Sequence, residues 1–228
     1  MNFSFLPKFL PYFNDGAIVT ILVSIIVVFF GTILGVILAL SKLSKYKLLR
    51  IISNVYVTVF RGTPMVLQIM IFFVAMKVDF LPTITIGILD IDLSRLFPGI
   101  VALSMNSGAY VAEVIRGGIL SVPQGQKEAA YSLGLRPAQT MFSVILPQAM
   151  RNILPALGNE FITIIKDSSL LATIGIMELY NGGLTTGSTT YITLEPLIIS
   201  GLYYLAMTMF ASWLLGKIEK KVGRAYTR

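Results

Sequence analysis

The chain has 228 residues, of which 55% are hydrophobic and only 13% are charged, and its mean hydropathy is +0.80. An ordinary soluble domain carries about 25% charged residues, so this composition indicates a membrane protein, and the net charge of +7 bears first on orientation in the membrane. The chain has no cysteine and no histidine, which excludes disulfides and thiolate metal sites, removes the commonest general base, and argues against an enzyme.

Five segments of the chain are apolar and long enough to cross a bilayer as helices, which takes about 20 residues. The first, 17–40, carries no charge and is too long for the apolar part of a signal peptide. The second is interrupted at 61–64, where Pro64 should free the carbonyl of Phe60 and kink the helix. We therefore predict an all-α membrane protein, one transmembrane domain over residues 1–228, with spans at 17–40, 52–76, 96–115, 152–171 and 196–215.

Basic residues concentrate in segments 41–50 and 116–151 and in the tail after the last span. These segments alternate along a five-span chain and so share one side, which the positive-inside rule makes the cytoplasm. The N-terminus should lie outside and the C-terminus in the cytoplasm. On the outside, segment 77–95 alternates apolar and polar residues, which predicts either a small hairpin or lid, or a plain connector.

The longest cytoplasmic loop, about 119–150, should hold a short helix over Lys127–Leu133, because this stretch is rich in helix formers. Gly134 suits the residue that follows a helix end, and Pro137 suits the first turn of a second helix. The small pair Ala129-Ala130 would form a knob able to enter a groove of a partner protein. The alternative is an ordinary polar loop.

A family resemblance rests on this loop and on its neighbours. The spacing of Glu128-Ala129-Ala130, Gly134, Val144 and Leu146-Pro147 resembles the EAA signature of ABC importer permeases, which usually have isoleucine in place of Val144. Further stretches resemble the polar-amino-acid branch of that family (the His/Glu/Gln/Arg/opine type), and they lie at 60–68, 107–135, 145–162 and 166–175. The resemblance implies that the loop docks on an ATPase through Glu128, Ala129, Ala130, Leu133 and Gly134.

The same resemblance implies the partners and the location. The chain would pair with a second permease subunit, identical or different, bind two cytoplasmic ATP-binding subunits, and receive an amino acid from an extracellular or periplasmic binding protein. The site of action would be the lipid bilayer of a bacterial cytoplasmic (inner) membrane. No GxxxxGKS/T phosphate-binding motif occurs, so ATP and Mg should be held by the partner ATPase. We expect no cofactor, metal, catalytic residue or nucleic acid for this chain.

Ionisable residues inside a span are costly and therefore point to function. Glu160 lies near the middle of the fourth span without a cation on its helix face, so we expect it to contact the cationic side chain of a basic amino acid; the alternative is an ion pair with Arg61 of this or a second subunit. Arg61 is either structural, paired with Glu113, or facing the carboxylate of the substrate. Glu113 is explained by Arg116, one helical turn away.

Small and polar residues at a similar depth complete the predicted substrate site, which comprises Glu160, Asn106, Ser107, Arg61, Gln68 and Thr163. Where the fourth span meets the outer surface, Asp and Ser side chains predict a break before a short helix near Leu170. This break would act either as an external gate or as a fixed helix cap, and it consists of Lys166, Asp167 and Ser168.

Together these features predict the permease subunit of an ATP-driven importer of amino acids, in particular arginine, lysine or histidine. An importer of the same family for neutral polar or acidic amino acids is the alternative. A stand-alone secondary transporter should show internal repeats and usually more spans, and the sequence shows neither. A scaffold subunit without a translocation path is disfavoured by Glu160 and by the kinked second span.

Overall fold

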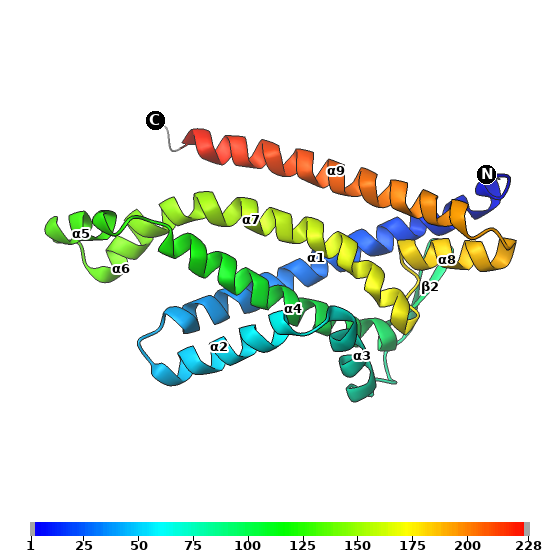
Figure 1. Ribbon diagram of the computed structural model, residues 1–228, viewed down its shortest axis with the longest axis horizontal. Coiled ribbons are helices and arrows are strands. Elements are labelled where there is room, and N and C mark those ends of the chain that lie inside the picture. The colour runs from blue at the N-terminus through cyan, green and yellow to red at the C-terminus, as the bar shows by residue number, and fades with distance from the viewer. Residues whose placement is uncertain (1–2, 226–228) are drawn as a thin grey trace.

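The protein is an elongated bundle of long helices that run in roughly one direction (Figure 1). The computed structural model describes the backbone of residues 3–225 and the side chains of residues 3–219. The long helices are α1 (Leu6–Leu43), α2 (Lys47–Gly62), α4 (Leu93–Leu120), α7 (Leu146–Asp167) and α9 (Leu194–Ala225). The predicted helical character is confirmed, and most helices extend beyond the apolar segments that predicted them.

The first helix shows why the predicted ends differ. α1 has 38 residues, a length of about 57 Å, which is nearly twice the roughly 30 Å of the hydrocarbon layer. The predicted span 17–40 lies within this helix, and the helix begins earlier because the apolar count stops at Asn14 and Asp15 while the helix does not. The additional turns are stabilised by burial of Phe9 and Phe13 against Leu179 and the first half of α9.

Length and apolarity alone identify fewer spans than the sequence predicts. Within the described chain two helices qualify, α1 and the part Leu194–Glu219 of α9, and the pair α2–α3 is a third if its two halves are counted as one. α4 and α7 have the length of a span but carry too many polar residues to qualify. The count of five spans stays a prediction.

The second predicted span is broken in the middle. α2 ends at Gly62, and α3 (Met65–Ala75) starts three residues later at an angle of 109° to it. The kink predicted from Pro64 is confirmed, because proline lacks the N–H that would continue the helix. The bend is larger than a simple proline kink because Thr63 and Pro64 are both extended, with ψ angles of 148° and 135°.

The segment between α3 and α4 forms a hairpin, one of the two structures predicted for 77–95. Strands β1 (Thr83–Ile86) and β2 (Leu89–Asp92) pair antiparallel. The turn of the hairpin is attached to α1, since the N–H of Ile88 donates a hydrogen bond to the carboxylate of Asp15 at 2.8 Å.

The loop between α4 and α7 contains two helices, as predicted. The first, α5 (Gln124–Ser132), is followed by Gly134 and then by α6 (Pro137–Thr140). A π-helical turn, η1 (Met141–Ile145), joins α6 to α7. The second predicted helix is therefore continuous with the next long helix, not separate from it.

The fourth long helix changes where the sequence predicts it, but without the predicted cap. α7 ends at Asp167 and a short 3-10 helix, η2 (Ser168–Ile174), follows directly and ends at Gly175 with a φ of +80°. Residues 167–169 remain helical, and no side chain of the described residues caps η2. Ser168 is fully buried, and its hydroxyl donates to the carbonyl of Ile165 at 2.8 Å instead of capping a new helix. α8 (Leu179–Thr190) then precedes α9.

The two ends of the bundle differ in the segments they hold (Figure 1). The turn between α1 and α2, the α5–α6 loop and the C-terminal end of α9 lie at one end, which we call the basic end. The start of α1, the hairpin and α8 lie at the opposite end. Between the ends, α1 and α4 approach closely at Gly31, where an added Cβ would lie 2.9 Å from that of Ser107, so a small residue is required there.

Candidate functional site

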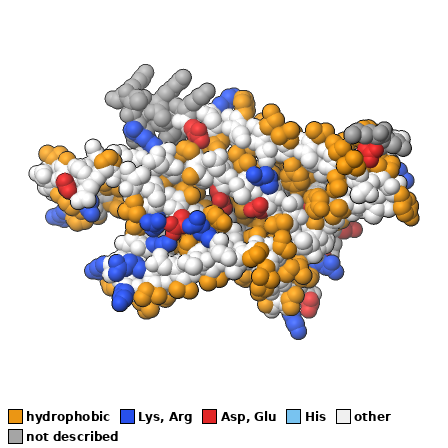
Figure 2. Space-filling view, viewed as in Figure 1, with side chains coloured by type: hydrophobic (Ala, Val, Ile, Leu, Met, Phe, Trp, Pro, Cys, Tyr) orange, Lys and Arg blue, Asp and Glu red, His pale blue; other side chains and the backbone are white. Residues whose placement is uncertain are grey.

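A polar cavity of about 290 Å³ lies in the bundle, supplied by three elements: the α2–α3 break, α4 and α7. Its lining consists of Thr63, Met65, Asn106, Tyr110, Glu160, Thr163 and Asp167. The α4 residues are four apart and the α7 residues three and four apart, so each helix presents one face to the cavity. Figure 2 shows acidic side chains beside basic ones in the middle of the visible face, and further acidic side chains toward its ends.

Two carboxylates, those of Glu160 and Asp167, face the same cavity. Among the side chains that the structure describes, neither forms an ion pair, and each lies within the electrostatic reach of another charge: Asp167 acts on Glu160, and the exposed Lys166 acts on Asp167. The hydroxyl of the fully buried Ser107 faces Glu160 without meeting the geometry of a hydrogen bond. The site therefore carries negative charge that no basic side chain of the described chain neutralises by direct contact.

Arg61 lies at the edge of this cavity. Its guanidinium is stacked over the ring of Tyr110, 5.0 Å from the ring centroid. It does not pair with Glu113, because that carboxylate contacts Arg116 at 2.8 Å and also Lys42 of α1. The predicted pair of Glu113 with Arg116 is confirmed, and the alternative pair of Arg61 with Glu113 is wrong. The pair of Arg61 with Glu160 does not form within this chain either.

The structure brings most of the predicted substrate residues to one place. Glu160, Asn106 and Thr163 line the cavity, Ser107 lies behind Glu160, and Arg61 lies at the edge. Gln68 is a residue of α3 that is 5% exposed, and its amide reaches the α2–α3 break, where backbone and side-chain partners occupy it. That these residues bind substrate stays a prediction.

The substrate site predicted from the sequence did not include four of the residues that line the cavity. Thr63, Met65 and Tyr110 carry no signal that separates them from ordinary span residues. Asp167 was assigned to an external gate because Asp-Ser-Ser resembles a helix cap. Its spacing of seven residues from Glu160, two helical turns, is the signal that places both carboxylates on one face.

The predicted gate residues do not act as one unit. Lys166 is exposed, Asp167 lines the cavity, and Ser168 is buried beneath it. A movement of this segment, where α7 gives way to the 3-10 helix η2, stays a prediction.

The second candidate region is the loop at the basic end. α5 ends in a Schellman motif, in which the N–H of Gly134 donates to the carbonyl of Tyr131 at 2.9 Å and that of Leu135 to the carbonyl of Ala130 at 3.1 Å. Gly134 has a φ of +78°, a conformation that costs a side chain with a Cβ. The predicted role of glycine at this position is confirmed.

Large apolar side chains are exposed on this otherwise polar loop. Leu133 is 82% exposed and Phe142 is 69% exposed, which is typical of a surface that docks a partner. Ala129 is exposed, whereas Ala130 is only 3% exposed and packs inward. The predicted two-alanine knob is therefore wrong, and the outward residues of the α5 end are Ala129 and Leu133.

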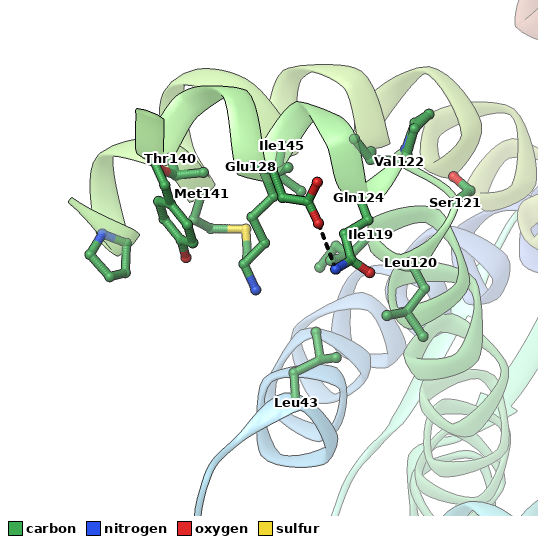
Figure 3. Close-up of a pocket in the computed structure, with 14 residues that line it drawn as sticks. Leu43, Ile119, Leu120, Ser121, Val122, Gln124, Glu128, Thr140, Met141 and Ile145 are labelled. Atoms are coloured by element: carbon green, nitrogen blue, oxygen red, sulfur yellow. Dashed lines mark hydrogen bonds between the residues drawn. The ribbon is translucent and has the colours of Figure 1, made fainter. Parts of the chain in front are cut away.

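A cavity of about 820 Å³ separates this loop from the end of α1. Figure 3 shows Leu43 of α1 on one side of it and Glu128 on the other, with a dashed line for the hydrogen bond that Gln124 donates to Glu128 at 2.9 Å. This bond joins the first turn of α5 to its middle. The carboxylate of Glu128 is thus held within the loop, and the helix is stiffened by an i,i+4 contact.

Comparison with known proteins identifies the family. The family described as binding-protein-dependent transport system inner membrane component matches residues 31–224. The chain is 37% identical to the arginine transport system permease protein ArtQ of Bacillus subtilis (strain 168), over 97% of both chains. It is 36% identical to the putative glutamine transport system permease protein GlnP of Rickettsia felis, over 96% of this chain and 98% of that one.

Solved structures give the same picture. A crystal structure of an amino acid ABC transporter with histidines superimposes with a TM-score of 0.85 at 38% identity, covering 97% of this chain and 100% of the other. A chain of the MetNI methionine ABC transporter in inward-facing conformations superimposes with a TM-score of 0.75 at 20% identity, over 97% and 99% of the two chains, which is a likeness of fold alone.

Proposed function

Because the chain belongs to the family of binding-protein-dependent transport system inner membrane components, we propose that it is the permease subunit of an ATP-driven amino-acid importer whose substrate is a basic amino acid. The observation that carries the proposal is the pair Glu160 and Asp167, two carboxylates that line one cavity without an ion-pair partner among the described residues. A cationic side chain of the substrate supplies the missing positive charge.

The remaining polar groups of the cavity favour the same class of ligand. The hydroxyl of Thr163 donates to the carbonyl of Asn159 at 3.1 Å and therefore meets a ligand as a hydrogen-bond acceptor. The hydroxyl of Thr63 is occupied within the protein, because it donates to the carbonyl of Val59 at 2.8 Å and accepts from the amide of Gln68 at 2.7 Å. A guanidinium has five N–H donors and no acceptor, and an ammonium has three, so the groups match.

The α-carboxylate of the substrate needs a cation of its own. Arg61 provides it, because its guanidinium lies over Tyr110 at the edge of the cavity and forms no ion pair within the described chain. An acidic amino acid would place a second carboxylate near Glu160 and Asp167, where like charges repel. A neutral amino acid would leave at least one of these partly buried carboxylates without a partner.

The charge of the cavity also supports a second permease subunit. A carboxylate that faces hydrocarbon is unfavourable by about 2.5–3.5 kcal/mol on insertion scales, and Glu160 and Asp167 are both only partly buried in the single chain. A second subunit over this face would exclude lipid and enclose a hydrated path. The basic end is then cytoplasmic, and the exposed Leu133 and Phe142 contact the ATP-binding subunit there.

The remaining parts of the proposal follow from this orientation. The start of α1, the hairpin and α8 face outward, toward a substrate-binding protein, with five spans and an outer N-terminus in a bacterial cytoplasmic membrane. ATP and Mg are held by the ATPase, since this chain has no phosphate-binding motif.

The test is equilibrium binding of radiolabelled amino acids to the purified permease–ATPase complex, followed by uptake into proteoliposomes that also contain the binding protein. We expect arginine and lysine to bind at least about tenfold more tightly than glutamine or glutamate, a difference of roughly 1.4 kcal/mol. Binding of glutamine in preference to arginine would refute the basic substrate. Absence of ATP-driven uptake of any amino acid would refute the importer.

A further inference from the structure

The α2–α3 break forms one wall of the cavity, since Thr63 and Met65 both line it. A bend of 109° with extended residues at its centre is not fixed by helical hydrogen bonds. Pro64 has no N–H to give to the carbonyl of Phe60, so that carbonyl needs donors from elsewhere. The shape of the wall therefore depends on whatever binds the free backbone groups of the break.

Gln68 ties the two halves of the broken helix together. Its amide nitrogen lies 2.8 Å from the carbonyl oxygen of Phe60 in α2, 3.1 Å from that of Thr63 and 2.7 Å from the hydroxyl oxygen of Thr63. The backbone N–H of Gln68 donates to the carbonyl of Pro64 at 3.1 Å. Because the side chain is 5% exposed, it acts on the break and not on a ligand.

Asn106 ties the break to α4. Its amide nitrogen donates to the carbonyl of Phe60 at 3.0 Å and to the side-chain oxygen of Gln68 at 2.9 Å. Both N–H groups of the Asn106 amide therefore have partners, and these two bonds fix the orientation of the amide. Asn106 also lines the cavity, so its oxygen, a hydrogen-bond acceptor, is the atom left for a ligand.

We infer that Gln68 and Asn106 form a clamp on the α2–α3 break that positions the cavity wall and presents the oxygen of Asn106, and not its N–H groups, to the substrate. Gln68 is a positioning residue that acts through Asn106 and the backbone, whereas Asn106 both positions and contacts. This inference deepens the proposed function and rests on it for the identity of the ligand. It reassigns Gln68, which the sequence places among the substrate contacts, to a supporting role.

If Gln68 and Asn106 form a clamp, their substitutions should have coupled effects on substrate binding. If they were independent contacts, the effects would simply add. Removing either amide leaves the carbonyl of Phe60 with one donor and frees the other amide to rotate. Once one amide is lost, loss of the second should change the binding free energy little further, because the effects of substitutions within one hydrogen-bond network do not add. The charge of the substrate does not enter this argument.

The experiment measures the Kd of radiolabelled arginine for the purified permease–ATPase complex carrying Gln68→Leu, Asn106→Leu, or both. We expect each single variant to raise the Kd by about tenfold or more and the double variant to be within about threefold of the weaker single one. Effects that multiply, or an unchanged Kd in Gln68→Leu, would overturn the clamp. Ser212→Ala is the control, since its hydroxyl also donates to a helix carbonyl, that of Thr208, but lies in α9.

Asn106→Asp separates positioning from simple contact. A carboxylate cannot donate to the carbonyl of Phe60 or to the oxygen of Gln68, so the clamp predicts weaker arginine binding. A direct electrostatic contact predicts tighter binding, because the substituted side chain adds a negative charge. Tighter binding by Asn106→Asp would overturn the inference.

Two further arms keep the result unambiguous. If Gln68→Leu does not assemble, Thr63→Val removes one acceptor of the clamp with nearly the same shape, and the clamp requires it to raise the Kd; an unchanged Kd would count against it. If the wild-type complex takes glutamine and not arginine, the proposed substrate fails, while the same variants measured with glutamine still test the clamp.

Discussion

Replacement of Glu160 by glutamine removes one of the two cavity carboxylates with almost no change in side-chain size. At about 4 Å and an effective dielectric constant near 20, two unit charges attract by roughly 4 kcal/mol. Part of this attraction is lost again to desolvation, because both the carboxylate and the substrate cation leave water, and Glu160 is partly exposed in the single chain. Since Asp167 remains, we expect a net loss of about 2 kcal/mol in arginine binding, or roughly a 30-fold higher Kd.

The assay is arginine and glutamine binding by the purified permease–ATPase complex, with the amount of assembled complex as the measure of folding. Glutamine binding should be unchanged or tighter, because an amide can still form hydrogen bonds with it. Asp167→Asn is the matched variant and should act in the same direction. A well-assembled Glu160→Gln complex with normal arginine affinity would show that the carboxylate does not contact the substrate. A fall in assembly that Arg61→Gln restores would instead indicate an ion pair with Arg61 of a second subunit.

Three further outcomes are expected. Gly134→Val places a β-branched residue at a φ of +78°, which costs on the order of 1–2 kcal/mol at this turn. ATPase association and coupled uptake should therefore fall while membrane insertion stays normal. Unchanged uptake would mean that the Schellman turn is not needed for coupling. Leu133→Asp alters a side chain that is 82% exposed and should abolish co-purification with the ATPase at normal permease yield, and retained co-purification would place the docking surface elsewhere. Burial raises the pKa of Glu178, which lies outside the predicted spans, from 4.5 to about 7. Between these pH values the folded state binds more protons than the unfolded state, so the melting temperature should fall as pH rises from about 5 to 7, and this dependence should weaken in Glu178→Gln. An equal pH dependence in both proteins would assign the effect to another group.

Local signals in the sequence predicted the parts of the fold that depend on a few neighbouring residues. Gly134 ends α5 because only glycine adopts a left-handed conformation without cost, and Pro64 breaks the second span because it lacks an N–H. Both effects act within one helical turn, so no tertiary information is needed. The Asp-Ser-Ser stretch after Lys166 marks the end of α7 but does not cap the next helix. Burial of Ser168 directs its hydroxyl back to the carbonyl of Ile165, and burial is not a local property.

The candidate site could be predicted only in part, for a related reason. The cost of a charge in a span singles out Glu160 from the sequence alone. The partners of a charge depend instead on which helices are neighbours. Lys42 is 71 residues from Glu113, and their contact, together with Arg116, leaves Arg61 to stack on Tyr110. The role of Gln68 likewise follows from the position of α4 beside the α2–α3 break.

The polar cavity also explains why hydropathy identifies too few spans. α4 and α7 have 28 and 22 residues, lengths of about 42 and 33 Å, which are sufficient to cross roughly 30 Å of hydrocarbon. Both carry charged and polar residues that lower their apolarity, and some of these residues line the cavity: Asn106 on α4, and Glu160 and Asp167 on α7. Others, such as Arg116 on α4 and Arg151 on α7, do not line it. Within the described chain, α1 and α9 contribute no residue to this cavity and are apolar enough to qualify by hydropathy. Part of the polarity that hides α4 and α7 from a hydropathy search is therefore the polarity of the candidate binding site.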